Sequence, residues 1–218
     1  MTSFSSPETL LRRWKILNLD FRLNRLGGVA VLIGSVVAGV ALALTPHGYS
    51  DPLRPVASLA ALGGAILVVL GAPAVFRRVW ERSFVLGIAA YAGIMTTLLL
   101  FQVAAGAVEG TMLPYLASHG GVPDRLPVTL GSLEKLALLA QLAGTICFAI
   151  AILRRRPYPW WLGVMLLLSL PAGFLPLPIQ LDGILIFCSL AVMGGITMSG
   201  LPTETRQEAA PLDARVRA

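Results

Sequence analysis

The stretch GGVAVLIGSVVAGVALALT, residues 27–45, decides the fold because its 19 residues include no charged side chain. A helix of this length, rising 1.5 Å per residue, reaches across the ~30 Å hydrocarbon core of a lipid bilayer. Five further apolar stretches follow along the chain. We therefore predict an all-α integral membrane bundle of six transmembrane helices, and we place them at 27–45, 56–76, 83–108, 131–153, 159–175 and 181–200.

The composition agrees with a membrane protein. Of the 218 residues, 56% are hydrophobic and only 13% are charged. A soluble domain carries about 25% charged residues. Half that share leaves too little polar surface to surround a water-soluble core of this size, so lipid must replace water around much of the chain.

The distribution of lysine and arginine predicts the orientation. All of the 17 such residues except Arg54, Arg125 and Lys135 fall before the first predicted helix, in every second connection, or in the tail. Cytoplasmic segments of membrane proteins carry the excess of positive charge. We therefore predict that both termini lie in the cytoplasm. The basic residues stand between apolar runs as topology signals do, so we do not expect nucleic-acid binding.

The two ends of the chain are more polar than its middle. In residues 1–26, Leu10, Trp14, Leu17 and Phe21 recur on one helical face, which predicts a cytoplasmic amphipathic helix lying in the membrane interface. The alternative is a basic flanking segment that only orients the first span. We predict that the tail, residues 201–218, is disordered and cytoplasmic.

Several classes of membrane protein require a residue that this chain lacks. No Asp, Glu, Lys, Arg or His lies in the middle third of any predicted span. That excludes the lysine of a retinal protein, the paired histidines of a membrane b-type cytochrome and the arginines of a voltage sensor. Cys147 and Cys188 form no CxxC motif, and His47 and His119 have no close ligand spacing. We predict no enzyme activity, no catalytic residue, no metal site and no cofactor.

One group of polar residues lies at the outer ends of the third and fourth predicted spans. Gln102 and Glu109 stand seven residues apart in one span, and Glu134 and Gln141 stand seven apart in the next. Two antiparallel helices would place Gln102 and Gln141 at one depth, with Glu109 near Glu134 and Lys135. We interpret the group first as a structural contact between helices. The alternative is a polar cleft, open to the outside, that binds an ion or small ligand.

Small residues recur within the spans, as in Ser35-xxx-Gly39 and Ala89-xxx-Gly93. This spacing lets helix backbones approach closely. We interpret it as helix association within one bundle, with a homo-oligomer as the alternative.

The segment from Leu130 to Gly200 resembles a widespread group of uncharacterised bacterial six-span membrane proteins. The likeness lies in a basic turn at Arg154, the element Pro159-Trp160-Trp161, and the proline-rich break at Leu175–Pro178. The resemblance implies a multi-pass protein of the bacterial cytoplasmic membrane, and it implies no activity. We expect a non-enzymatic structural, accessory or lipid-contacting protein whose partners are membrane lipids. The alternative is a carrier of small solutes or ions.

Overall fold

The computed structural model describes residues 7–45, 51, 53–112, 115, 116, 118, 128–172 and 181–200, and every regular element within them is helical. The elements are α1 (Pro7–Leu44), α2 (Leu53–Arg82), α3 (Phe84–Thr97), η1 (Leu98–Ala105), η2 (Val108–Met112), α5 (Val128–Arg155), α6 (Trp160–Ala172) and α7 (Leu181–Ser199). All-helical architecture, predicted from the apolar runs, is confirmed for this part of the chain.

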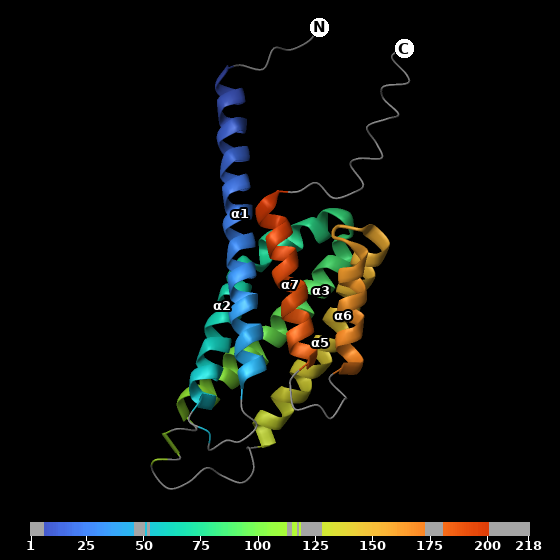
Figure 1. The fold of residues 1–218 in the computed structure, drawn as a ribbon. Coiled ribbons are helices and arrows are strands. Elements are labelled where there is room, and N and C mark those ends of the chain that lie inside the picture. The colour runs from blue at the N-terminus through green and yellow to red at the C-terminus, as the bar shows by residue number, and fades with distance from the viewer. Residues whose placement is uncertain are drawn as a thin grey trace.

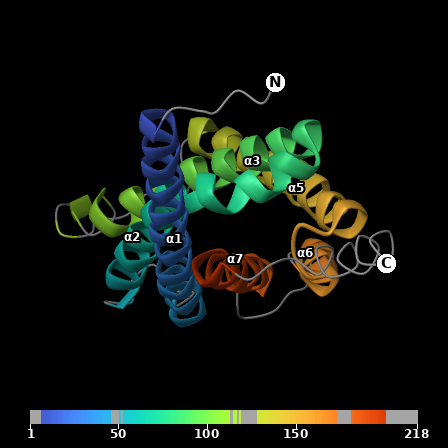
Figure 2. The ribbon, with the colours of Figure 1, turned by 90° about the horizontal axis from the view of Figure 1, so that it is seen from above.

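The helices run alternately up and down and form one bundle (Figure 1). Each helix packs on its neighbour in chain order, and α7 returns to α1, so the bundle closes on itself (Figure 2). The α2–α3 turn, the α5–α6 turn and the C-terminal end of α7 all lie at one end (Figure 1). We call this the arginine-rich end, because the helices and turns at this level carry Arg25 in the middle of α1 together with Arg77, Arg78, Arg82, Arg154, Arg155 and Arg156.

Among the described residues, four helices are long and apolar enough to cross a membrane. They cover Arg22–Leu44, Leu53–Arg82, Lys135–Arg155 and Leu181–Ser199. Two shorter apolar helices cover Phe84–Leu100 and Trp160–Ala172. The chain thus has the helices of a membrane protein by length and composition.

Helix α1 differs from the sequence prediction. We expected an interfacial helix in residues 1–26 and a separate span from Gly27, but one helix runs unbroken from Pro7 to Leu44. Its N-terminal turns project beyond the bundle (Figure 1). The two glycines at the expected break instead serve packing. A Cβ atom at Gly27 would lie 2.5 Å from the Cβ of Ala74 in α2, and one at Gly28 would lie 2.8 Å from the carbonyl oxygen of Gly194 in α7.

Helix α2 continues past the predicted end of the second span, Phe76, to Arg82. It contains Pro73, whose missing N–H and bulky ring bend a helix. After this proline the last turns of α2 run across the arginine-rich end toward α3 (Figure 1). The segment predicted as a basic loop is helical, and an ion pair from Arg77 Nε to Glu81 Oε1 at 3.1 Å joins successive turns of it.

The third predicted span, 83–108, begins as α3 but widens after Thr97 into the π-helical segments η1 and η2. The side chain of Thr97 sits at the change, with its hydroxyl 3.0 Å from the carbonyl oxygen of Gly93 and 3.1 Å from that of Ala137 in α5. Apart from Gln102, Glu109 and Thr111, the residues from Leu98 to Met112 are apolar or small. Such a pattern fits α and π winding equally, so nothing in the sequence indicates the change.

The last two helices begin close to their predicted positions. Helix α6 starts at Trp160 and is described to Ala172, with Pro171 in its last turn. The rest of the predicted fifth span, up to Leu175, lies outside the described residues. Helix α7 starts at Leu181 and ends at Ser199, where Gly200 adopts the left-handed conformation that commonly ends a helix, with φ of 66°. The tail, residues 201–218, lies outside the described residues.

Glycine contacts bring helix backbones together at several levels. A Cβ at Gly34 of α1 would lie 2.5 Å from the carbonyl oxygen of Gly64 in α2. A Cβ at Gly93 of α3 would lie 2.5 Å from the Cα of Gly144 in α5. Real Cβ atoms do not approach other heavy atoms so closely, so these positions admit only glycine without a shift of the helices.

Aromatic side chains fill the space between α2, α3 and α5 near the arginine-rich end. The rings of Phe76 and Phe148 stack with centroids 4.7 Å apart. Tyr91 meets Phe76 edge to face at 5.3 Å and also meets Trp80 at 5.3 Å. These geometries are favourable for aromatic pairs and hold α2 against both partners.

Gly93→Ala tests the glycine contact between α3 and α5. The added methyl must push α3 away from α5, and overpacking of this kind costs about 1–3 kcal/mol. We expect a lower melting temperature of the purified protein in detergent. Gly63→Ala is the matched control, because a Cβ there meets nothing within 4 Å. Equal melting temperatures for the two variants would contradict the tight α3–α5 contact.

Candidate functional site

Of the four polar residues predicted to form an outer site, Gln141 is the one whose side chain the structure describes. Gln141 donates from Nε2 to Asp182 Oδ2 of α7 at 3.3 Å. The side chains of Gln102, Glu109 and Glu134 lie outside the described residues. The partner that the structure gives for Gln141 is therefore on the last helix, not on the third span.

The relative height of α3 and α5 also differs from the prediction. Thr97 meets Ala137 across the interface. Gln102 follows Thr97 by five residues toward the opposite end of the bundle, whereas Gln141 follows Ala137 by four residues toward the arginine-rich end. The Thr97–Ala137 contact places the two glutamines nine residues apart in depth, and the Gly93–Gly144 contact places them six residues apart, which corresponds to about 9–13 Å. The backbones of α3 and α5 therefore do not have the equal depth at these positions that was predicted.

A better-defined polar region lies at the arginine-rich end, around the turn between α5 and α6. Arg156 has φ of 48°, a left-handed conformation that is uncommon outside glycine, and its N–H donates to the carbonyl oxygen of Ile152. Pro157 and Pro159 flank Tyr158 and restrict the backbone on both sides. This rigid turn directs Tyr158 into the bundle, where its side chain is 1% exposed.

Tyr158 joins three elements at this end. Its hydroxyl donates to the carbonyl oxygen of Val75 in α2 at 2.8 Å and lies 3.0 Å from Thr197 Oγ1 in α7. The guanidinium carbon of Arg78 lies 5.8 Å from the centre of the Tyr158 ring, within the range of a cation–π contact. The Val75 carbonyl lies just after Pro73, in the bent part of α2. The phenol therefore ties the bend to the C-terminal turns of α7.

Burial raises the pKa of Tyr158 to about 12, and the hydrogen bond with Thr197 and the charge of Arg78 offset part of that rise. The phenol is consequently neutral and available as a hydrogen-bond donor throughout the physiological pH range. The contacts of Tyr158 indicate a structural role, in which the side chain links α2 to α7.

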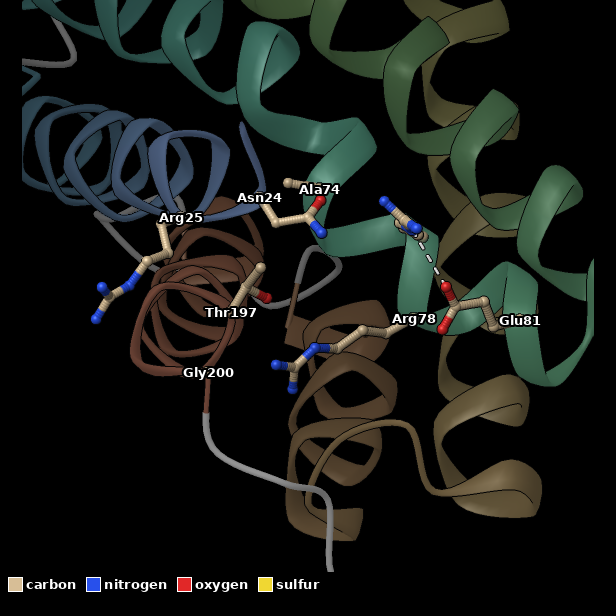
Figure 3. A pocket seen from close by; sticks show the side chains of 8 residues that line it. Asn24, Arg25, Ala74, Arg78, Glu81, Thr197 and Gly200 are labelled. Carbon is tan, nitrogen blue, oxygen red and sulfur yellow. Dashed lines mark hydrogen bonds and ion pairs between the residues drawn. The ribbon is translucent and has the colours of Figure 1, made fainter. Parts of the chain in front are cut away.

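Next to Tyr158 lies a pocket of about 280 Å³ between α1, α2 and α7 (Figure 3). Its polar lining comes from Asn24, Arg25, Arg77, Arg78, Glu81 and Thr197. Three arginines and one glutamate give the lining a formal charge of +2. The charge of this lining favours an anion over a cation.

Each arginine of the pocket is held by a contact of its own. Arg25 donates from Nε to the carbonyl oxygen of Met198, in the last turn of α7, at 3.0 Å. Arg77 is paired with Glu81, and Arg78 lies over Tyr158. In Figure 3, Arg78 extends from α2 toward the end of α7, with Thr197 between it and Arg25. The charged groups are thus positioned by the fold.

Comparisons with protein-family models, curated proteins and solved structures found no match to this chain. The chemistry of the pocket itself is therefore the guide to its role. Among the described residues, no three of His, Cys, Asp and Glu gather as a metal site would require. Cys147 and Cys188 are free thiols there, one partly buried and one exposed.

The sequence pattern marked the arginines of this pocket only as topology signals. Arg25 and Arg78 are 53 residues apart, and no local motif connects them. One signal in the sequence is relevant to this pocket: three predicted helices each have basic residues at the end that is predicted to face the cytoplasm. That signal gives the side of the membrane but not which residues share a pocket.

Tyr158→Phe tests the connection made by the phenol. The substitution keeps the ring and removes the hydroxyl, which leaves the buried Val75 carbonyl without this donor. Such a change costs about 1–3 kcal/mol. We expect a lower melting temperature in detergent, whereas Tyr115→Phe, at an exposed position, should leave it unchanged. A Tyr158→Phe protein as stable as the wild type would contradict the structural role.

The raised pKa of Tyr158 predicts a pH dependence of stability. The folded state favours the neutral phenol, so its contribution is complete below the unfolded value of about 10 and declines as the pH rises toward 12. The stability difference between wild type and Tyr158→Phe should be constant from about pH 7 to 9 and narrow between about pH 10 and 12. Thermal unfolding across this range measures it. A gap that stays constant over the whole range would show that Tyr158 ionises without cost.

Proposed function

We propose that the chain is a non-enzymatic, lipid-contacting structural or accessory protein of a bacterial cytoplasmic membrane, with six spans and both termini in the cytoplasm. The observation that supports it most is the outward surface of the bundle. Large apolar side chains stand exposed on it, including Leu70 at 72%, Phe84 at 69% and Val85 at 77%. Water would penalise such a surface, whereas lipid solvates it.

The proposal of six spans counts the two shorter apolar helices as spans in addition to the four long ones. From Phe84 to Met112 the chain is helical throughout, which is long enough to cross the hydrocarbon core in spite of its π-helical part. Helix α6 runs antiparallel to both α5 and α7 (Figure 1). Its described 13 residues reach about 20 Å.

Aromatic and basic residues support a membrane surface at the arginine-rich end. Trp160 and Trp161, in the first turn of α6, are 58% and 40% exposed. They follow closely on Arg154, Arg155 and Arg156. Exposed tryptophans mark the membrane interface, and arginine-rich turns mark its cytoplasmic side.

The polar groups inside the helices support a structural role rather than catalysis. The hydroxyls of Ser169 and Ser189 donate to carbonyl oxygens one turn earlier in their own helices. Such bonds satisfy the hydroxyl locally and leave neither serine as a nucleophile directed at a pocket. The alternative of a carrier working between the third and fourth spans has less support, because α3 and α5 are in close contact at Gly93 and Gly144.

Cysteine labelling in intact cells tests the topology. Cys147 and Cys188 are first replaced by serine, and a single cysteine is then introduced as Arg155→Cys or as Asp51→Cys. A membrane-impermeant maleimide should label Asp51→Cys in intact cells and Arg155→Cys only after permeabilisation. Labelling of Arg155→Cys from outside would reject the proposed orientation. Recovery of the protein in the soluble fraction would reject the membrane location.

A further inference from the structure

We propose that the pocket between α1, α2 and α7 binds a phosphate group, supplied by an anionic phospholipid headgroup or by a soluble phosphate ester. The lipid source rests on the proposed membrane location. The phosphate chemistry rests only on the pocket itself, so the two can fail separately.

The charge of the pocket favours such a ligand. Arg25, Arg77 and Arg78 line it together with one carboxylate, Glu81. Arginine presents a planar fork of N–H donors that matches the geometry of phosphate oxygens. Asn24 and Thr197 add neutral polar groups to the same lining. A cationic ligand would meet three like charges here.

The anchoring contacts prepare the arginines for binding. Met198 holds the guanidinium of Arg25 in place, and the Tyr158 ring holds that of Arg78. Side chains already ordered lose less conformational freedom when a ligand binds. The Arg77–Glu81 pair is a partly exposed surface pair, with exposed fractions of 45% and 63%, so it is readily rearranged around an anion.

The size of the pocket limits the ligand. Sites for drug-sized molecules enclose about 300–1,000 Å³. A pocket of about 280 Å³ accommodates a phosphate and the small group attached to it, while a longer ligand must extend out of the opening. A lipid meets this condition, because its acyl chains can lie outside the pocket against the bundle.

The position of the pocket places it at the level of lipid headgroups. Thr197 and Gly200 belong to the C-terminal end of α7, and exposed Trp160 begins α6 at the same end of the bundle. Basic pockets between transmembrane helices on the cytoplasmic side are a known way to bind anionic headgroups.

The test uses the purified full-length protein in two arms. In the first, phosphatidylglycerol is titrated into phosphatidylcholine nanodiscs, and native mass spectrometry counts retained lipid. In the second, inorganic phosphate is titrated in detergent and binding is followed by calorimetry. We expect saturable binding. Arg25→Gln/Arg78→Gln should weaken it by at least about tenfold, because the double substitution removes two of the three positive charges of the lining.

Arg154→Gln/Arg155→Gln is the matched control, because it removes two charges from the same end without touching the pocket. It should bind as the wild type does. Arg77→Gln, whose side chain is partly exposed, replaces the double variant if that protein does not fold, and it should weaken binding about tenfold.

Binding in the lipid arm that disappears only with the pocket arginines identifies a headgroup site. Binding of inorganic phosphate without retained phosphatidylglycerol supports the phosphate site and identifies a soluble source. Absence of binding in both arms overturns the proposal, as does equal weakening by the control variant. The detergent arm remains decisive even if the topology experiment rejects the membrane location.

Discussion

Close contact between helix backbones at glycines is the constraint on which this bundle depends. Lipid is as apolar as the side chains it surrounds, so helices in a membrane gain little from burying leucine against leucine. Van der Waals contact must hold them instead, and it is strongest where no side chain separates the backbones. Gly34 and Gly64, and likewise Gly93 and Gly144, provide such contacts. Their positions fix the height of each helix against its neighbour.

The same contacts produce the pocket at the arginine-rich end. Gly27 lets α1 approach α2 at Ala74, and the next residue, Gly28, lets it approach α7 at Gly194. These two adjacent glycines thus let α1 pack closely against both α2 and α7. Arg25, two residues before Gly27 in α1, therefore lines one pocket with the arginines of α2. Packing therefore imposes a cluster of like charges that electrostatics alone would disperse.

The sequence predicted those features that depend on whether lipid or water surrounds a segment. Long uncharged runs predict helices that lipid can surround, and Leu181–Ser199 begins at its predicted residue. The sequence did not predict features that depend on how two helices pack against each other, such as their relative depth. Equal seven-residue spacings, Gln102 to Glu109 and Glu134 to Gln141, suggested that the two glutamines share a depth, but the contacts between α3 and α5 place them about 9–13 Å apart in depth. Hydropathy also does not distinguish a glycine at a helix boundary from a glycine inside a helix that contacts a neighbouring helix, as Gly27 does.

Arginines show the same limit most clearly. The positive-inside rule counts charge on one side of the membrane and is indifferent to where each residue lies within that side. Arg154 and Arg78 therefore carry identical topological information. In the folded bundle Arg78 faces the pocket and the Tyr158 ring, whereas Arg154 lies exposed near the start of the α5–α6 turn. An arginine becomes part of a pocket only when tertiary packing gives it neighbours. Distinguishing the two roles requires the contacts between helices, which no periodicity within a single helix encodes.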